Sequence, residues 1–167
     1  MAGELIDNGV QHFKFEEDFV EDNVRCIPMI VRFKLDAVGI KLKLAEWSRL
    51  HTNERSMLAQ EPCSTPVEKI MYLNNLRSLV RLRTGNEATG LAIDKEPSWA
   101  NLKRIEPALQ DKAKEHNWHI TLEQWKSLNN LQRFALLKLF RPGHENKNFP
   151  KAMVEFGLVK AGVNGEL

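Results

Sequence analysis

The sequence predicts an all-α protein, folded as a single compact helical domain with at most a tiny two-stranded β bridge. Apolar residues recur at helical spacing along most of the chain, and helix-starting and helix-ending residues flank these segments. Strand-like alternation is confined to 40–43 and 118–121, which we expect to pair as that bridge. With 167 residues, 43% of them hydrophobic, the chain is long enough for one well-buried core.

The first half is predicted to contain four helices. A proline in the first turn and a glycine at the end delimit a helix over 27–38, and two shorter helices follow over 44–50 and 52–58. The fourth helix begins at Thr65-Pro66-Val67-Glu68, a capping box with proline at the first helical position. It ends before Gly85, where glycines and a proline predict a loop over 85–98.

The second half is predicted to contain four more helices. Their starts are marked by Pro107, by a capping box at 121–124, by Asn130 and by Pro150. Arg141-Pro142-Gly143 ends the third of them, because proline cannot continue a helix. We expect loose tails at 1–12 and 159–167, with the domain spanning 13–158.

The two halves contain an internal repeat. With a shift of 78 residues, the repeat halves, about 27–60 and about 105–140, align without a gap, and Gly39 meets Asn117, both of which tolerate positive φ. Arg55 also meets Arg133. We expect the copies to pack around a pseudo-two-fold axis and to share one core, formed by Leu44, Trp47, Leu50, Leu58, Leu122, Trp125, Leu128 and Leu136.

The net charge of +2 argues against a dedicated nucleic-acid binder, and no helix presents a clean run of polar residues for base edges. The charge is uneven, however, because residues 1–24 carry seven acids and one base. Two stretches without acids are either solvated helix faces, balanced by the acidic N-terminal segment folding over them, or a basic patch for an acidic partner or anion. They hold Lys69, Arg77, Arg81 and Arg83, and Lys126, Arg133, Lys138 and Arg141.

The lack of a recognisable targeting signal and the low number of cysteines favour a cytoplasmic protein. No window approaches the run of about 20 apolar residues that a membrane span needs, and the acidic start resembles neither a signal nor a transit peptide. Cys26 and Cys63 are interpreted as two buried thiols, although one disulfide between them is arithmetically open.

A dense polar loop between two apolar helices is the main candidate for a functional surface. It comprises Arg141, His144, Glu145, Asn146, Lys147 and Asn148, and ends at Phe149. Such a loop can satisfy helix ends, bind a ligand or partner, or build a metal or acid–base site on His144 and Glu145. No third metal ligand is evident, so we predict no metal and no cofactor.

Arg25 and Cys26 form a second candidate cluster just before the first helix. Cys26 would be reactive if it were exposed beside positive charge, and inert if buried at the helix start. The sequence contains no phosphate-binding glycine loop, paired-cysteine zinc motif or nucleophile elbow, and we predict no catalytic residue.

Several strings of this sequence resemble the nitrate reductase-associated protein family, over about residues 13–158. They are Phe15-Glu16-Glu17-Asp18-Phe19, Arg25-Cys26-Ile27-Pro28-Met29, Lys34-Leu35-Asp36, 39–44, Trp47, Cys63, 131–136, Arg141-Pro142, 144–149 and 155–158. The resemblance implies a small protein linked to nitrate assimilation, and it implies no catalytic residue, cofactor or reaction.

Two functions follow as hypotheses. The first is a non-enzymatic accessory or regulatory protein that binds nitrate reductase or another nitrogen-assimilation protein through the loop at His144 and the basic stretches. The second is a small enzyme or ligand-binding protein, whose pocket forms where Arg25 and Cys26 meet the segment from His144 to Phe149. The second requires both segments to converge on one cleft.

Overall fold

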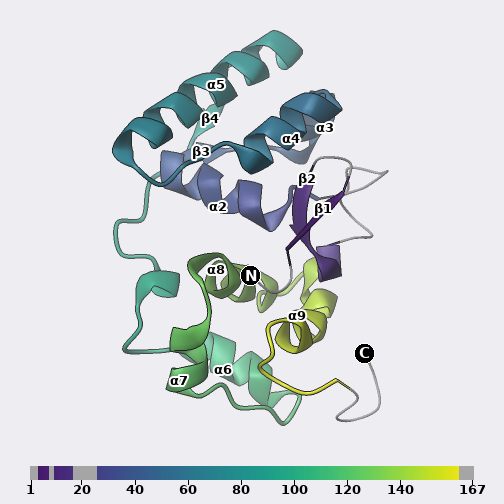
Figure 1. Cartoon of the computed structure of the whole chain (residues 1–167), viewed down its shortest axis with the longest axis vertical. Coiled ribbons are helices and arrows are strands. Elements are labelled where there is room, and N and C mark those ends of the chain that lie inside the picture. Colours follow the sequence, from purple (N-terminus) through teal and green to yellow (C-terminus); the bar gives the residue numbers. More distant parts are fainter. Residues whose placement is uncertain (1–3, 8–9, 17–25, 162–167) are drawn as a thin grey trace. The chain divides into compact units, whose positions relative to one another are not determined.

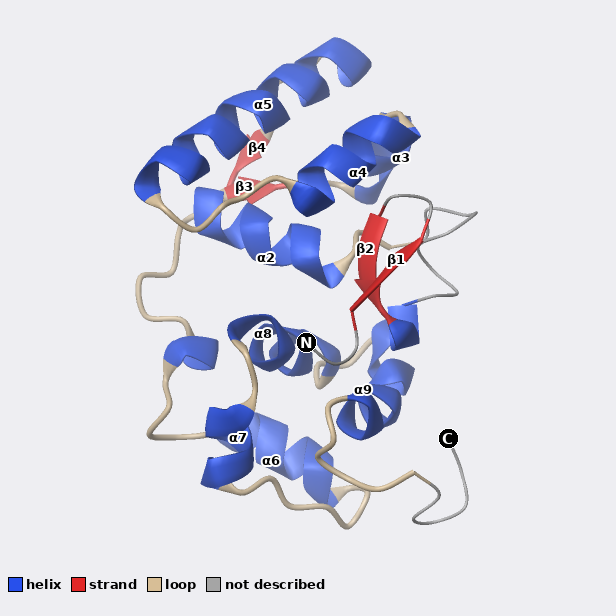
Figure 2. Ribbon diagram, viewed as in Figure 1, coloured by secondary structure: helices blue, strands red, loops and turns tan. Residues whose placement is uncertain are grey.

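The computed structural model describes residues 4–7, 10–16 and 26–161, which fall into two compact units. The N-terminal unit is Glu4–Asp94, and the C-terminal unit begins at Lys95. Helices dominate both units, which confirms the predicted all-α class (Figures 1 and 2). The two repeat copies fall in different units, and the expectation of one shared core within a single domain stays a prediction.

In its described residues, the N-terminal unit packs four helices around one apolar cluster that includes Leu35, Trp47, Leu58, Tyr72 and Leu76. The unit also contains two small antiparallel strand pairs: β1 pairs with β2, and β3 pairs with β4. Its elements are β1 (Glu4–Asp7), β2 (Val10–Phe13), the 3-10 turn η1 (Lys14–Glu16), α2 (Met29–Val38), β3 (Ile40–Lys41), α3 (Leu44–Arg49), α4 (Thr52–Gln60), α5 (Pro66–Thr84) and β4 (Thr89–Gly90).

The predicted pairing of 40–43 with 118–121 is wrong. β3 pairs instead with β4, which lies in the segment expected to be a loop. Gly39 explains why β3 pairs with β4: its carbonyl accepts the Leu91 amide at 2.7 Å, and its φ is +73°. A Cβ at residue 39 would lie 2.8 Å from the Leu91 oxygen, so glycine serves both the turn and the close approach. Within the expected tail 1–12, Glu4–Asp7 and Val10–His12 belong to the β1–β2 hairpin.

A buried carboxylate joins this hairpin to α2. Glu16 is only 5% exposed, and its two oxygens accept the backbone amides of Phe13 at 3.0 Å and Met29 at 2.9 Å. Met29 begins α2, so the negative charge lies at the positive end of the helix dipole. One of the seven acids of residues 1–24 is therefore part of the fold.

The C-terminal unit combines four helices with two 3-10 turns. Its elements are η2 (Ser98–Ala100), α6 (Pro107–Lys114), α7 (Leu122–Ser127), α8 (Asn130–Leu139), η3 (His144–Asn148) and α9 (Phe149–Glu155). The buried side chains include Leu109, Trp125, Phe134, Phe149 and Met153. The predicted helix starts are reproduced to within one residue at α6, α7 and α8.

The internal repeat is visible in the backbone. A shift of 78 residues carries α3 onto α7 and the start of α4 onto the start of α8. It also carries Gly39, with φ of 73°, onto Asn117, with φ of 60°. Both copies thus contain a helix, a left-handed residue, a six-residue helix and a longer helix.

The same shift aligns the helix caps. At the starts of α3, α4, α7 and α8, the residue at the third helical position accepts the backbone amide of the capping residue, at 2.9, 3.2, 2.9 and 3.0 Å. In the C-terminal copy, Thr121 and Asn129 also accept amides from their helices. Lys43 and His51 take these places in the N-terminal copy and make no such side-chain bond. The sequence-predicted capping box at 121–124 is present as expected.

The expectation that Leu44 and Leu122 belong to the core is wrong. They are 43% and 37% exposed, whereas the other six repeat positions are buried: Trp47, Leu50, Leu58, Trp125, Leu128 and Leu136. Each exposed leucine is the first residue of a six-residue helix. Because side chains lean toward the N-terminus of a helix, a side chain at this position projects past the helix end.

Candidate functional site

The polar loop lies in the C-terminal unit, between α8 and α9. It runs from Arg141, which is exposed, into η3, and Asn146 braces it by donating from its side chain to the Arg141 carbonyl at 3.3 Å. Lys147 is exposed. The side chains of His144 and Glu145 lie outside the described residues, so the proposed metal or acid–base role of this pair stays untested.

Asn148 forms the buried base of this loop. It is 3% exposed, and its side-chain oxygen has no hydrogen-bond partner among the described residues. The next residue, Phe149, is fully buried and begins α9. A buried acceptor without a donor costs free energy, so it is a place where a donor from a ligand or a water would be stabilised.

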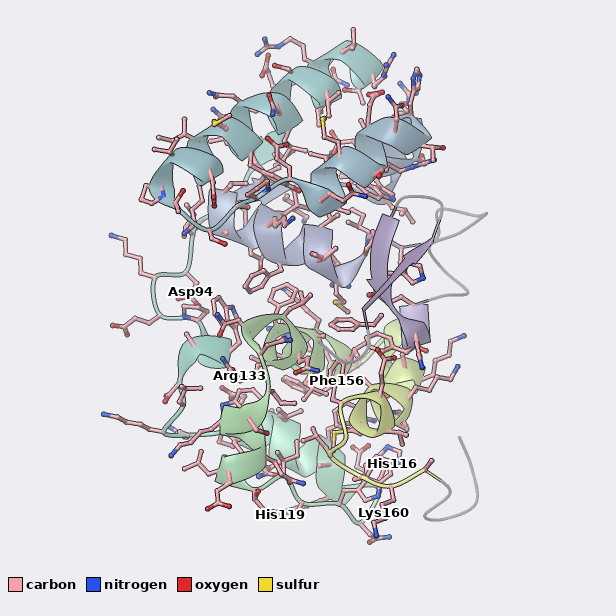
Figure 3. All side chains as sticks on the ribbon, viewed as in Figure 1. Asp94, His116, His119, Arg133, Phe156 and Lys160 are labelled. Carbon is pink, nitrogen blue, oxygen red and sulfur yellow. The ribbon has the colours of Figure 1, made fainter. Side chains whose placement is uncertain are left out.

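An aromatic cluster lies beside Phe149, and sequence reasoning missed it. The His116 ring is 6.2 Å from the ring of Phe149 and stacks on Trp118 with ring centres 4.8 Å apart (His116 is labelled in Figure 3). The Trp118 indole nitrogen is buried and also has no partner among the described residues. The sequence signal that could have revealed the cluster was Asn117, which lies between His116 and Trp118. Its positive φ of 60° turns the chain so that both side chains lie on one side.

Cys26 lies just before α2 in the N-terminal unit and is half-buried. Arg25 lies outside the described residues. Cys26 and the loop at His144 belong to different units, each described by itself, so their convergence on one cleft stays a prediction. The other thiol, Cys63, is buried, and this burial raises its pKa. A thiol with a raised pKa is a poor nucleophile at neutral pH.

Several cations of the two basic stretches hold the fold together. Arg81 pairs with Glu87 at 2.7 Å, and Arg83 donates to both oxygens of Glu54 at 2.7 and 3.1 Å. Burial raises the pKa of Glu54, but the hydrogen bonds from Arg83 and the His51 amide outweigh it, and the net pKa is lowered. This ion pair locks the start of α4 to the end of α5.

Arg133 is a densely hydrogen-bonded cation of the C-terminal unit (Figure 3). It is 5% exposed, and its guanidinium donates to the carbonyls of Trp99 at 2.7 Å, Trp125 at 3.3 Å and Leu128. It also donates to the side chain of Asn130. The residue therefore acts as a clamp between η2, α7 and α8 and is removed from any surface for an anion.

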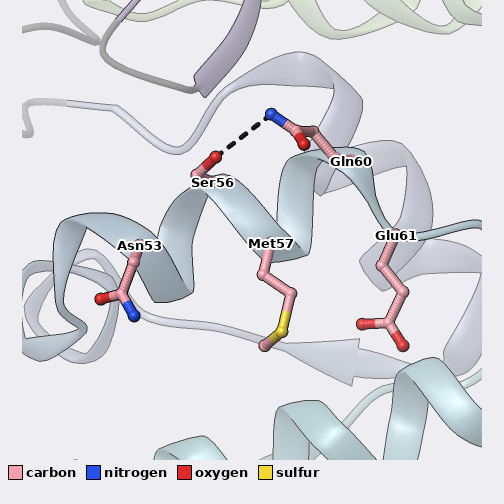
Figure 4. A pocket seen from close by; sticks show the side chains of 5 residues that line it. All are labelled: Asn53, Ser56, Met57, Gln60 and Glu61. Atoms are coloured by element: carbon pink, nitrogen blue, oxygen red, sulfur yellow. Dashed lines mark hydrogen bonds between the residues drawn. The ribbon is translucent and has the colours of Figure 1, made fainter.

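The described residues line open depressions, two of which a ligand could enter. One, of about 440 Å³, lies over α4 and is lined by Asn53, Ser56, Met57, Gln60 and Glu61 (Figure 4). The other, of about 580 Å³, lies in the C-terminal unit and is lined by Lys95, Glu96, Pro97, Ser98, Ala100, Asn101, Arg104 and Glu106. Neither contains a residue predicted as functional from the sequence.

Among the described residues, no three His, Cys, Asp or Glu side chains gather closely enough to hold a metal ion. Nor does any described helix combine the length and the hydropathy needed to cross a bilayer.

Comparison with known proteins connects this geometry to a family. A family model described as conserved nitrate reductase-associated protein matches residues 12–156. Comparison with curated proteins found no match, and comparison with solved structures found none either. The family match covers both units, with the polar loop and the aromatic cluster inside it, and it confirms the resemblance seen in the sequence. The chain belongs to the nitrate reductase-associated protein family.

Proposed function

We propose that the protein is a non-enzymatic accessory or regulatory protein of nitrate assimilation, which binds nitrate reductase or another nitrogen-assimilation protein directly. The family match over residues 12–156 carries this proposal. We place the role in the cytoplasm, where cysteines such as Cys26 and Cys63 stay reduced.

The polar loop supports a role in protein contact. Arg141 and Lys147 are exposed, while the neighbouring Asn148 and Phe149 are buried and anchor the loop to the unit. Exposed cations on a rigid base offer a partner a preorganised surface, because little side-chain and backbone freedom is lost on binding.

A binding assay with purified nitrate reductase from the same organism tests this proposal. We expect the full chain to bind the enzyme and to change its turnover, and the double variant Arg141→Glu, Lys147→Glu to bind at least tenfold more weakly. Lys103→Glu, an exposed cation of the C-terminal unit outside the loop and the basic stretches, is the matched control and should bind normally. If pull-downs from nitrate-grown cells repeatedly lack nitrate reductase and every other nitrogen-assimilation protein, the proposal fails.

The second candidate is a small-ligand protein or enzyme that uses the segment from His144 to Phe149. The unpartnered, buried oxygen of Asn148 is the observation that favours it. A thermal-shift screen with metals, nitrate, nitrite, molybdate and nucleotides tests it, because a ligand of the native state raises stability by mass action. The shift should disappear in Asn148→Leu and in His144→Ala, and no shift with any compound would refute this candidate.

A further inference from the structure

The depression of about 580 Å³ in the C-terminal unit is lined by charges of both signs. Its volume lies in the range of about 300–1,000 Å³ that is typical of small-molecule sites. Its polar lining comes from one segment of the chain, 95–106, and consists of Lys95, Glu96, Ser98, Asn101, Arg104 and Glu106. We call this site the η2 depression, because the segment contains η2. Its two cations and two acids balance at neutral pH, so the lining as a whole carries no net charge.

Buried side chains of the unit hold this segment in place. The Trp125 indole nitrogen donates to the Asn101 carbonyl at 2.9 Å, and the Arg133 guanidinium donates to the Trp99 carbonyl at 2.7 Å. Residues 91–106 lead from β4 to α6 with η2 as their regular structure, and long irregular stretches in compact domains are usually functional. A fixed backbone also lowers the entropy cost of binding a ligand.

The two cations of the η2 depression have no partner among the described residues. Lys95 and Arg104 are exposed, and neither side chain forms an ion pair or a hydrogen bond with a described residue. Glu106 accepts the Ser98 hydroxyl at 3.4 Å through one carboxylate oxygen, Oε2, and its other oxygen receives no hydrogen bond from the described residues. Lys95, Arg104 and Glu106 therefore line one depression without neutralising each other, and their charges remain open to a ligand.

The Asn101 side chain is oriented by a turn within the segment. Its oxygen accepts the Lys103 backbone amide at 2.9 Å, which identifies the side-chain nitrogen as the atom left to donate. Asn101 is exposed and lies three residues before Arg104. Both residues offer donors, and an arginine guanidinium binds a carboxylate through two parallel hydrogen bonds. The η2 depression thus combines donors for a carboxylate with an acceptor, Glu106, for an ammonium group.

We propose that the η2 depression binds a free amino acid in its zwitterionic form. Arg104 and Asn101 bind the carboxylate, and Glu106 binds the ammonium group. Lys95 and Glu96, at the other end of the segment, contact the side chain of the amino acid. This inference goes beyond the proposed function, because it gives the protein a small-molecule site whether or not the protein binds nitrate reductase.

Ligands that carry charge of a single sign fit the η2 depression less well. A phosphate or a dicarboxylate would bring its negative charges close to Glu96 and Glu106, and a polyamine would bring its positive charges close to Lys95 and Arg104. Like charges held together in a site cost free energy, whereas a zwitterion offers a partner to each sign. The balance of the lining charges therefore favours a ligand with one group of each sign.

Calorimetric titration of the full chain with a panel of single L-amino acids tests the inference. We expect saturable binding of at least one amino acid, and its N-acetyl and C-terminal amide derivatives should bind at least tenfold more weakly, because each lacks one charge. Arg104→Gln and Glu106→Gln should also weaken binding at least tenfold, with unchanged melting temperature. Lys103→Gln is the matched control and should bind normally, because Lys103 is an exposed neighbour that does not line the depression.

Nuclear magnetic resonance of the isotope-labelled chain locates the site and separates the outcomes. The amide resonances of residues 95–106 should shift with the amino acid, whereas shifts confined to the segment from His144 to Phe149 would overturn the inference. No binding of any amino acid, equal affinity for the two derivatives, an equal loss in Lys103→Gln, or tighter binding of phosphate or spermidine would each overturn it as well. A failure to bind nitrate reductase would overturn the proposed function and leave this inference standing.

Discussion

Replacing Arg133 by methionine should destabilise the C-terminal unit severely. Methionine keeps the apolar stem but removes every donor, leaving the carbonyls of Trp99, Trp125 and Leu128 without their guanidinium partner. A hydrogen bond to a charged group contributes about 1.5–3 kcal/mol. Because bonds to one side chain are not additive, we expect a total loss of about 3–5 kcal/mol.

The repeat supplies a matched control for this variant. Arg55 occupies the equivalent place in the N-terminal copy, but its guanidinium donates to the exposed Thr52 hydroxyl at 3.3 Å. Arg55→Met should therefore change the free energy of unfolding by only about 0.5 kcal/mol. The chemical change is identical in both variants, so the difference between them measures the clamp alone.

Urea unfolding followed by circular dichroism and tryptophan fluorescence measures both variants. Three of the four tryptophans, residues 99, 118 and 125, lie in the C-terminal unit, so fluorescence reports mainly on that unit. We expect the Arg133→Met fluorescence transition to move to lower urea while the Arg55→Met transition stays in place. A loss in Arg133→Met no larger than that in Arg55→Met would refute the assignment of Arg133 as a structural clamp.

Three further variants follow from the caps, the tight turn and the buried ion pair. Lys43→Thr should complete the capping box of α3 and add about 0.5–1 kcal/mol of stability, measured as a higher Tm. Gly39→Ala should cost about 2–4 kcal/mol through its positive φ and its clash, whereas Gly90→Ala, with open space around it, should change the urea midpoint little. Glu54 has a lowered pKa in the folded state, so its contribution is present above the unfolded value of 4.5 and is lost as the pH falls through the lower folded value. Wild type should thus lose stability more steeply below pH 4.5 than Arg83→Met, as followed by urea midpoints at each pH.

Each of these expectations has a result that contradicts it. An unchanged Tm in Lys43→Thr would show that the missing cap is not limiting for α3. Equal costs for Gly39→Ala and Gly90→Ala would remove the close approach to Leu91 as the reason for the glycine. Parallel pH profiles for wild type and Arg83→Met would show that the ion pair with Glu54 does not stabilise the fold.

The local rules that act within a few residues could be read from the sequence. The capping box at Thr65 and the left-handed Asn117 both appear where they were predicted. The repeat could also be recognised in the sequence, because the spacing of Trp and Leu residues indicates a buried helix face independently of the rest of the chain. These features depend on chain neighbours, and the sequence contains all of them.

Partners distant in the chain could not be predicted. Gly39 was correctly read as a helix end, but its close approach to Leu91, and hence β3 pairing with β4, depends on a contact 52 residues away. The role of Arg133 was missed for the same reason, since a basic residue in a helix pattern looks the same whether it is solvated or clamps carbonyls. The unpartnered oxygen of Asn148 likewise becomes visible only through its burial.

The two repeat copies are stabilised by different contacts. At equivalent positions, Gln132 accepts the Asn129 amide within its own cap, whereas Glu54 accepts the His51 amide and also binds Arg83 of α5. A neutral amide oxygen suffices for a cap, but only a carboxylate adds the charge that pairs with an arginine. The acid at position 54 therefore serves to attach α5 to α4. The N-terminal copy has weaker caps, because the side chains of Lys43 and His51 accept no helix amide, and an ion pair to an added helix supports it. The C-terminal copy relies on complete caps and on the Arg133 clamp, so the same chain pattern is stabilised by different contacts in its two copies.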